Sequence, residues 1–196
     1  MGEQRMIAID SEYGSGGREI AREVGEKLNL PVYDKNIVEL IAKEKNVDMT
    51  PFQQNDEAPI PFLTRHVGEH TTSFEEHLAY MTFEFIKEHA DNGESFVVIG
   101  HCADEVLRDY EEASLIFITG NLLDKDLRIQ NDFQVSSKQA LNMIRKNDNR
   151  RKRYHNQYSS YSWGDSRGYD LCISSSPLDI AGTVEAIVGY VNTRYK

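Results

Sequence analysis

The sequence has little cysteine and no long apolar segment. Its two cysteines, Cys102 and Cys172, lie far apart and form no metal-binding or redox motif, so a reducing compartment is expected. No stretch approaches the roughly 18 to 20 apolar residues that would span a membrane. The first residues also lack the cleavage-site pattern of a signal peptide. We therefore expect a cytoplasmic protein with no membrane partner.

The sequence also lacks an excess of positive charge. Its formal net charge is -10 over 196 residues, and an acidic protein binds nucleic acid poorly because phosphate contacts dominate that affinity. The exception is the basic segment 138–153, KQALNMIRKNDNRRKR, which holds seven Lys or Arg against one Asp. One basic segment in an acidic chain indicates a small polyanionic ligand held locally, and we expect no nucleic-acid partner.

Apolar runs alternate with helical periodicity along the chain, which predicts a single α/β domain over residues 1–196. Strands are expected at 6–10, 30–34, 95–100, 114–119 and 169–175. Helices are expected at 18–28, 35–45, 74–89, 103–107, 122–131, 136–156 and 177–192. The strands are apolar without alternation, which is typical of a parallel sheet covered on both faces. Three of the five prolines fall within 47–73, which we interpret as a loop region.

Ligands of parallel sheets bind beyond the carboxyl ends of the strands. The segments expected to matter most are therefore those that follow strands, namely 11–18, 34–36, 100–104 and the loops after 119 and 175.

A glycine cluster joins the first expected strand to the first expected helix. Gly14, Ser15, Gly16 and Gly17 stand within the stretch IAIDSEYGSGGREIAREVGEKL. Glycine lets backbone N–H groups approach a phosphate and adopts the positive φ angles that such a loop needs. The N-terminus of the following helix also attracts an anion. A tight turn without a ligand is the alternative, but the parallel α/β context and the basic segment favour phosphate binding.

The glycine loop departs from the usual pattern GxxxxGK[ST]. The loop can be aligned with this pattern either by its Gly-Ser-Gly or by setting Arg18 against the lysine. In neither alignment does it contain a lysine, and no hydroxyl stands where a magnesium ligand is usually offered. Arg18 lies close to the place of the missing lysine and can supply charge, as a planar fork and not as a compact ammonium. We expect Arg18 to curl back over the phosphates. The alternative is that it points outward and pairs with Glu19 or Glu23.

Four segments together resemble the cytidylate-kinase-like proteins, a divergent branch of the P-loop nucleoside monophosphate kinases. They are SEYGSGGREIA, PVYDKNIVELIA, VVIGHCADEVL and DNRRKRYHNQYSSYSWGDSRGYDLCISSSPL. The resemblance implies a three-layer α/β/α P-loop fold with a parallel five-stranded sheet, a helical acceptor-binding insert at about 35–92 and a mobile lid at about 136–165. It implies transfer of the γ-phosphate of ATP, with Mg²⁺, to a nucleoside monophosphate such as CMP. Non-catalytic nucleotide binding and a different small-molecule acceptor are the alternatives.

The resemblance also implies roles on the donor side. The loop from Gly14 to Arg18 would hold the donor phosphates, and the basic segment matches the lid. Arg145, Arg150 and Arg151 would act with Arg18 as catalytic arginines, because a transferring phosphoryl group needs positive charge around it. Arg151 lies about 100° round the helix from Arg150, so at least one of the two should face solvent. A solvated basic helix surface is the alternative.

On the acceptor side, Asp34 matches a residue that lines the nucleoside site, and it could also cap the following helix. His101 stands where the family has an arginine that meets phosphate, or it is a satisfied residue at a helix start. Asp104 could serve the acceptor or be a favourable acid in a first helical turn. Trp163 is expected to pack and not to stack on a base. No metal site of protein ligands is expected, because no histidine spacing suits zinc.

Overall fold

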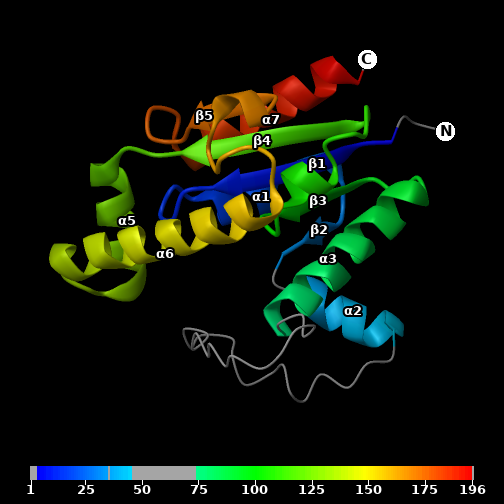
Figure 1. Ribbon diagram of the computed structural model, residues 1–196. Coiled ribbons are helices and arrows are strands. Elements are labelled where there is room, and N and C mark those ends of the chain that lie inside the picture. The colour runs from blue at the N-terminus through cyan, green and yellow to red at the C-terminus, as the bar shows by residue number, and fades with distance from the viewer. Residues whose placement is uncertain (1–3, 35, 46–73, 196) are drawn as a thin grey trace.

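The computed structural model describes residues 4–34, 36–45 and 74–195, and these form an α/β structure around one parallel sheet (Figure 1). The strand order is β2-β3-β1-β4-β5, and each neighbouring pair is parallel. The strands are β1 (Met6–Ser11), β2 (Val32–Tyr33), β3 (Phe96–Ile99), β4 (Ala113–Thr119) and β5 (Leu171–Ser174). The predicted five-stranded parallel fold is thereby confirmed. The predicted loop at 47–73 lies outside the described residues.

Helices follow the strands in alternation, as the periodicity predicts. They are α1 (Gly17–Leu28), α2 (Ile37–Lys45), α3 (Phe74–Asp91), α4 (Ala103–Val106), α5 (Leu122–Phe133), α6 (Ser137–Tyr158) and α7 (Asp179–Arg194), with a short 3-10 helix at Ser166–Gly168. None of the described helices combines the length and the apolar character that crossing a membrane requires.

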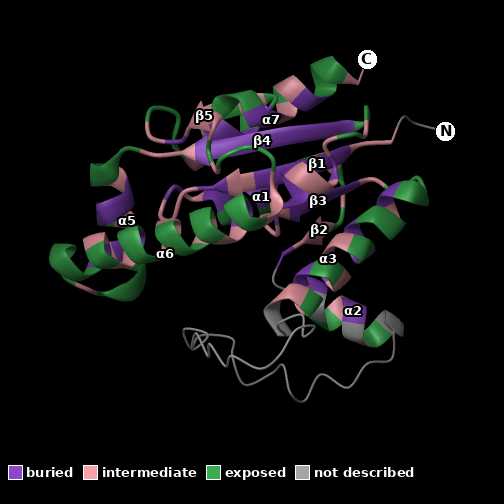
Figure 2. Ribbon diagram, viewed as in Figure 1, coloured by how far each residue is buried: buried purple, intermediate pink, exposed green. Residues whose placement is uncertain are grey.

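The core has two halves because alternate residues of β1 point to opposite faces of the sheet. Met6 and Ala8 pack with α2, α3 and α4, whereas Ile7 and Ile9 pack with α1 and α7. Figure 2 shows the buried strands lying between helices whose outer sides are exposed. Burying a strand on both faces requires apolar residues at successive positions, which explains the continuous apolar runs of the sequence.

Strand β2 is shorter than expected, with two residues in place of five. It lies at the edge of the sheet, where Val32 pairs with Val97 and Tyr33 with Val98. Leu30 is not available for the sheet, because its N–H closes the end of α1 by donating to the Gly25 carbonyl. The strand ends one residue before Asp34, which therefore lies at the carboxyl edge of the sheet.

Candidate functional site

The glycine loop connects the end of β1 to the start of α1. Gly14 and Gly16 have φ angles of 86° and 82°, which L side chains rarely adopt. A β-carbon on Gly17 would lie 2.3 Å from the β-carbon of Ser11, so the backbone here is packed too closely for any other residue. No side chain among the described residues caps the first turn of α1. The helix therefore presents its N-terminus to a ligand, as an anion-binding loop does.

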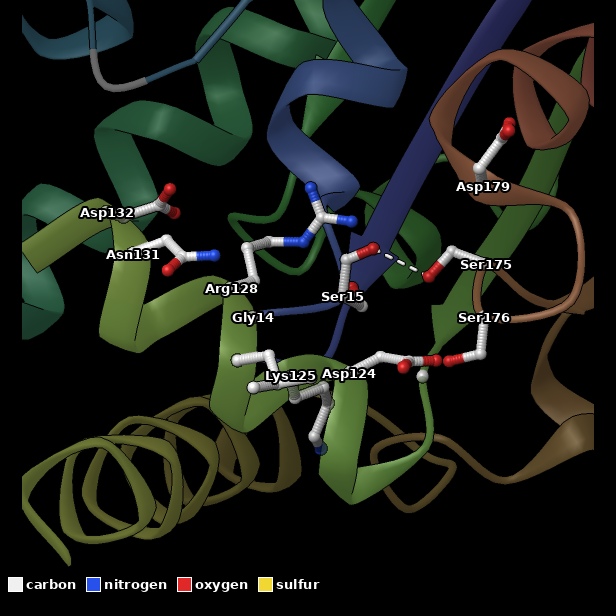
Figure 3. Close-up of a pocket in the computed structure, with 12 residues that line it drawn as sticks. Gly14, Ser15, Asp124, Lys125, Arg128, Asn131, Asp132, Ser175, Ser176 and Asp179 are labelled. Carbon is white, nitrogen blue, oxygen red and sulfur yellow. Dashed lines mark hydrogen bonds between the residues drawn. The ribbon is translucent and has the colours of Figure 1, made fainter. Parts of the chain in front are cut away.

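A cavity of about 450 Å³ adjoins this loop (Figure 3). Three segments line it: the loop itself, helix α5, and the residues between β5 and α7. The lining residues are Gly14, Ser15, Gly120, Asp124, Lys125, Leu127, Arg128, Asn131, Asp132, Ser175, Ser176 and Asp179. Their polar character and the position beyond the carboxyl ends of β1, β4 and β5 suit a polar ligand that also contacts the loop.

Arg128 is the cation of α5 that faces the loop in this cavity. A β-carbon on Gly16 would lie 3.3 Å from the central carbon of its guanidinium, and its side chain points towards Ser15 in Figure 3. Its Nη1 is 3.7 Å from Glu19, and its Nε is buried with no partner among the described residues. Arg128 was not among the residues predicted from the sequence, although the loop after residue 119, which leads into α5, was expected to be functionally important.

Lys125 lies close to the loop but is already neutralised. Its buried ammonium group is 3.0 Å from Glu12 and 3.4 Å from Asp148 of α6. The other oxygen of Asp148 accepts a hydrogen bond of 2.7 Å from the backbone N–H of Tyr13. Lys125 and Asp148 thus join the loop, α5 and α6, which is a structural role.

Among the predicted arginines of the basic segment, Arg151 reaches the loop. It donates to the carbonyl and, at 3.4 Å, to the hydroxyl of Ser11, and it lies over the ring of Tyr13. Arg145 and Arg150 are exposed, and Arg150 bonds to Asn147 on its own helix. The helical rotation between Arg150 and Arg151 accounts for this difference.

Arg18 takes neither of the two orientations expected from the sequence. Its Nη2 donates to Oδ1 of Asp34 at 3.0 Å, and its Nε lies 2.9 Å from Oδ2. Arg22, one turn further along α1, donates to the same Oδ2 at 3.1 Å. The structure therefore brings Arg18 from the predicted donor group to Asp34 of the predicted acceptor group.

His101 lies in a strained turn at the end of β3. Gly100, His101 and Cys102 have φ angles of 68°, 56° and 57°, so three consecutive residues are left-handed. Such conformations cost about 1 to 3 kcal/mol each for residues other than glycine and concentrate at functional sites. Burial lowers the pKa of His101, opposed by the charge of Asp34 and assisted by that of Arg18. The imidazole is therefore neutral at pH 7.

Asp104 is buried in a polar cluster and not on an open surface. It accepts from Nε2 of His155 at 2.8 Å and from Arg108 at 3.4 Å. Burial by itself lowers the pKa of His155, but the hydrogen bond and the charge of Asp104 outweigh that effect and raise it. This pair joins the C-terminal half of α6 to α4, and the sequence analysis missed His155.

Trp163 packs edge-on against Phe117, with ring centres 5.3 Å apart, and donates its indole N–H to Asp10 at 2.7 Å. The packing agrees with the expectation from the sequence, whereas the hydrogen bond to Asp10 was not predicted. Atoms of Cys102, Asp104 and His155 that could bind a metal lie within 4.8 Å of one another. We interpret this group as the ion pair described above with a neighbouring thiol, and the expectation of no metal site remains a prediction.

Comparisons with known proteins identify the family and the fold of the chain. Residues 6–177 match the Cytidylate kinase-like family. An uncharacterized protein from Eubacterium ventriosum has a similar crystal structure, with a TM-score of 0.77, 33% identity, and coverage of 97% of this chain and 99% of its own. No curated protein matches the chain.

Two kinases share the fold at lower similarity. Shikimate kinase from Bacteroides thetaiotaomicron is 12% identical with a TM-score of 0.53, covering 96% of this chain and 98% of its own. A gluconokinase from Sinorhizobium meliloti is 12% identical with a TM-score of 0.50, and the match covers 100% of this chain and 93% of its own.

Proposed function

The chain belongs to the cytidylate kinase-like family, and from this premise we propose that it transfers the γ-phosphoryl group of ATP to a nucleoside monophosphate, with CMP as the acceptor that the family description indicates. The family and the kinase neighbours support phosphoryl transfer in general. One observation carries the proposal: the glycine loop, with its uncapped helix N-terminus, opens onto a cavity in which a guanidinium lies over Gly16.

The donor nucleotide would bind across the loop and this cavity. Its phosphates would lie on the backbone of Gly14 to Gly17, and its nucleoside would occupy the space between α5 and the residues before α7. Arg128 would supply the charge that a loop lysine otherwise brings, because its Nε is buried without a partner among the described residues. A buried donor of this kind gains a charge-assisted hydrogen bond when a phosphate arrives.

The transferring group would lie between the loop and the acceptor edge, where Arg151 already contacts Ser11. Phosphoryl transfer chiefly requires stabilisation of the charge that develops in the transition state, and the contact of Arg151 with Ser11 supports this role for Arg151. Arg145 and Arg150 remain proposed phosphate ligands that would have to reorient from solvent. Asp34, His101 and Asp104 are the proposed acceptor-side residues.

Magnesium would accompany ATP, held mainly by the phosphates, and Asp104 would offer it a carboxylate oxygen. Asp10, at the end of β1, lies close enough to Asp104 that burial first, and then the charge of Asp104, raise the pKa of Asp10. Oδ1 of Asp104 is buried without a partner in the described part of the chain. Mg²⁺ prefers carboxylate oxygens and water, and it neutralises charge on the phosphates when bound.

A panel of nucleoside monophosphates with ATP and magnesium, read out as ADP release, tests the proposal. CMP-dependent release above the background hydrolysis of ATP is the expected result. Arg151→Ala should lower turnover more than it weakens CMP binding, because charge directed at the transition state acts on rate. The control is Arg5→Ala at the amino end of β1, where the side chain contacts Asn192 and not the loop.

The absence of a loop lysine favours a second candidate, a nucleotide-binding protein without catalysis. In that case ATP would still bind, but no acceptor in the panel would increase ADP release.

A further inference from the structure

A second cationic group lies on the other side of the glycine loop from the donor cavity. Arg18 and Arg22 project from successive turns of α1 towards the carboxyl end of β2, where Asp34 stands. Neither arginine lines the donor cavity. The group therefore lies outside the donor cavity, beside Asp34 and His101, where the acceptor is proposed to bind.

Asp34 holds both arginines in place. Its Oδ1 accepts from Nη2 of Arg18, and its Oδ2 lies 2.9 Å from Nε of Arg18 and accepts from Arg22. The carboxylate side chain is only 12% exposed, whereas the arginine side chains are 45% and 58% exposed. The carboxylate is thus the buried base of the group, and the two guanidinium groups form its outer face.

The charges of this group do not cancel. Two guanidinium groups share one carboxylate, which leaves one positive charge uncompensated among the described residues. The contacts within the group use Nη2 and Nε of Arg18 and Nη2 of Arg22. The remaining N–H donors of both forks have no partner in the described part of the chain. An exposed pair of forks with free donors matches the geometry of an oxyanion.

The neighbouring residues strengthen the case. His101 lies close enough to Asp34 and Arg18 to respond to their charges, and burial keeps its imidazole neutral at pH 7. It therefore supplies no positive charge for an acceptor. Arg151, which contacts Ser11 at the end of β1, is also close enough to Arg18 for that charge to lower its pKa. An anion between Arg18 and Arg151 would relieve that repulsion.

We propose that Arg18 and Arg22 bind the oxyanion of the acceptor, that Asp34 is the residue that positions them, and that the acceptor is a phosphate monoester. This inference rests on the proposed phosphotransferase function and deepens it by naming the residues that bind the phosphate of the acceptor. Two guanidinium groups with one net positive charge suit a dianionic phosphate better than a neutral hydroxyl compound. Arg18 thereby serves the acceptor and not the donor.

The test uses calorimetric titration of the full-length protein saturated with ADP, so that the loop is occupied. The titrants are CMP, inorganic phosphate, cytidine as the neutral analogue, and gluconate as a carboxylate. Arg22→Ala should lower the affinity for CMP by about 10-fold to 100-fold, as expected for lost bonds to a charged group. The affinity for inorganic phosphate should fall in parallel, and Arg22→Lys should restore part of the lost affinity. The affinity for ADP should not change, which also shows that the variant is folded.

Lys27→Ala is the matched control, because Lys27 is a cation of the same helix that pairs with Glu185. The inference is overturned if Arg22→Ala binds CMP and phosphate like the parent protein. It is also overturned if the ADP-bound parent binds neither, if cytidine binds as tightly as CMP, or if gluconate binds and CMP does not. Failure of ADP itself to bind would instead count against the proposed function. In that event, inorganic phosphate is titrated into the parent protein and into Arg22→Ala without ADP. Weaker phosphate binding by the variant would support the role of the two arginines, and equal binding would overturn it.

Discussion

At the scale of single residues, the cations near the glycine loop differ in how fully they are neutralised. Lys125 shares its ammonium between two carboxylates, whereas the nearest carboxylate to Arg128 is Glu19 at 3.7 Å. A cation already held by two anions has little attraction left for a third, so Arg128 is the better candidate for a donor phosphate.

We expect Arg128→Ala to weaken ATP binding by about 10-fold to 100-fold, the cost of losing a hydrogen bond to a charged group. The thermal stability without nucleotide should change little, because the guanidinium makes one long ion pair. Fluorescence titration with a labelled ATP analogue measures the effect, with Arg5→Ala as the control. Equal affinity in Arg128→Ala and in the parent protein would remove Arg128 from the donor site.

The buried pair of His155 and Asp104 should make stability depend on pH. The folded-state pKa of His155 is raised by Asp104 despite burial, so the folded state binds the proton more tightly than the unfolded state. The resulting stability is fully present below the unfolded pKa of about 6.5 and is lost as pH rises through the raised folded value. Asp10, Arg108 and Tyr169 are the other ionisable groups around the pair.

Urea denaturation of the parent protein and of His155→Gln at several pH values measures this dependence. The difference in unfolding free energy between them should be larger at about pH 6 than at about pH 9. Asp104→Asn removes the carboxylate that raises the pKa of His155. In that background, the effect of His155→Gln on the unfolding free energy should change less between the two pH values. A difference that stays constant over this pH range would mean that the pair does not gain stability from protonation.

At the scale of elements, helix α6 is anchored over its C-terminal half. Asp148 accepts from Tyr13, Arg151 donates to Ser11, and His155 bonds to Asp104. These contacts recur at roughly one-turn intervals, so one face of the helix follows the loop and the start of α4. A movement of this half of the helix would therefore have to break these contacts.

The packing of the glycine loop leads to a paired prediction. Gly17→Ala should destabilise the fold by about 1 to 3 kcal/mol, because its β-carbon would meet Ser11 at 2.3 Å. Gly189→Ala, in the exposed middle of α7 with no atom near its β-carbon, should instead stabilise it by about 0.5 to 1 kcal/mol. Thermal melts of both variants check the opposite signs, and equal shifts would contradict the packing argument.

At the scale of the whole molecule, a nucleotide that binds only the folded state should stabilise it. ATP or ADP at about 100 times its dissociation constant should add roughly 2.7 kcal/mol. For a chain of this size that corresponds to a rise in melting temperature of about 5 to 10 °C. Differential scanning fluorimetry with and without magnesium measures it, and no shift with any nucleotide would contradict phosphate binding by the loop.

The sequence was sufficient for the architecture of the described residues. Continuous apolar runs such as those of β1 and β4 predict strands buried on both faces, and helical periodicity between them predicts a parallel sheet. The glycine loop and the family resemblance also follow from local patterns. The boundaries of β2 did not, because the end of α1 competes for Leu30 through a backbone hydrogen bond that only the folded chain contains.

By itself, the sequence determined the order of the elements, the place of the loop, and the carboxyl edge at which a ligand is expected to bind. These depend on periodicity and glycine content, which are local properties of the chain. Only the tertiary structure decided which charges meet. Arg18 lies 16 positions from Asp34, and Arg151 lies 140 positions from Ser11, yet each pair is in contact. Ion pairs and side-chain orientation depend on how helices pack across the sheet, and that packing is a property of the whole fold.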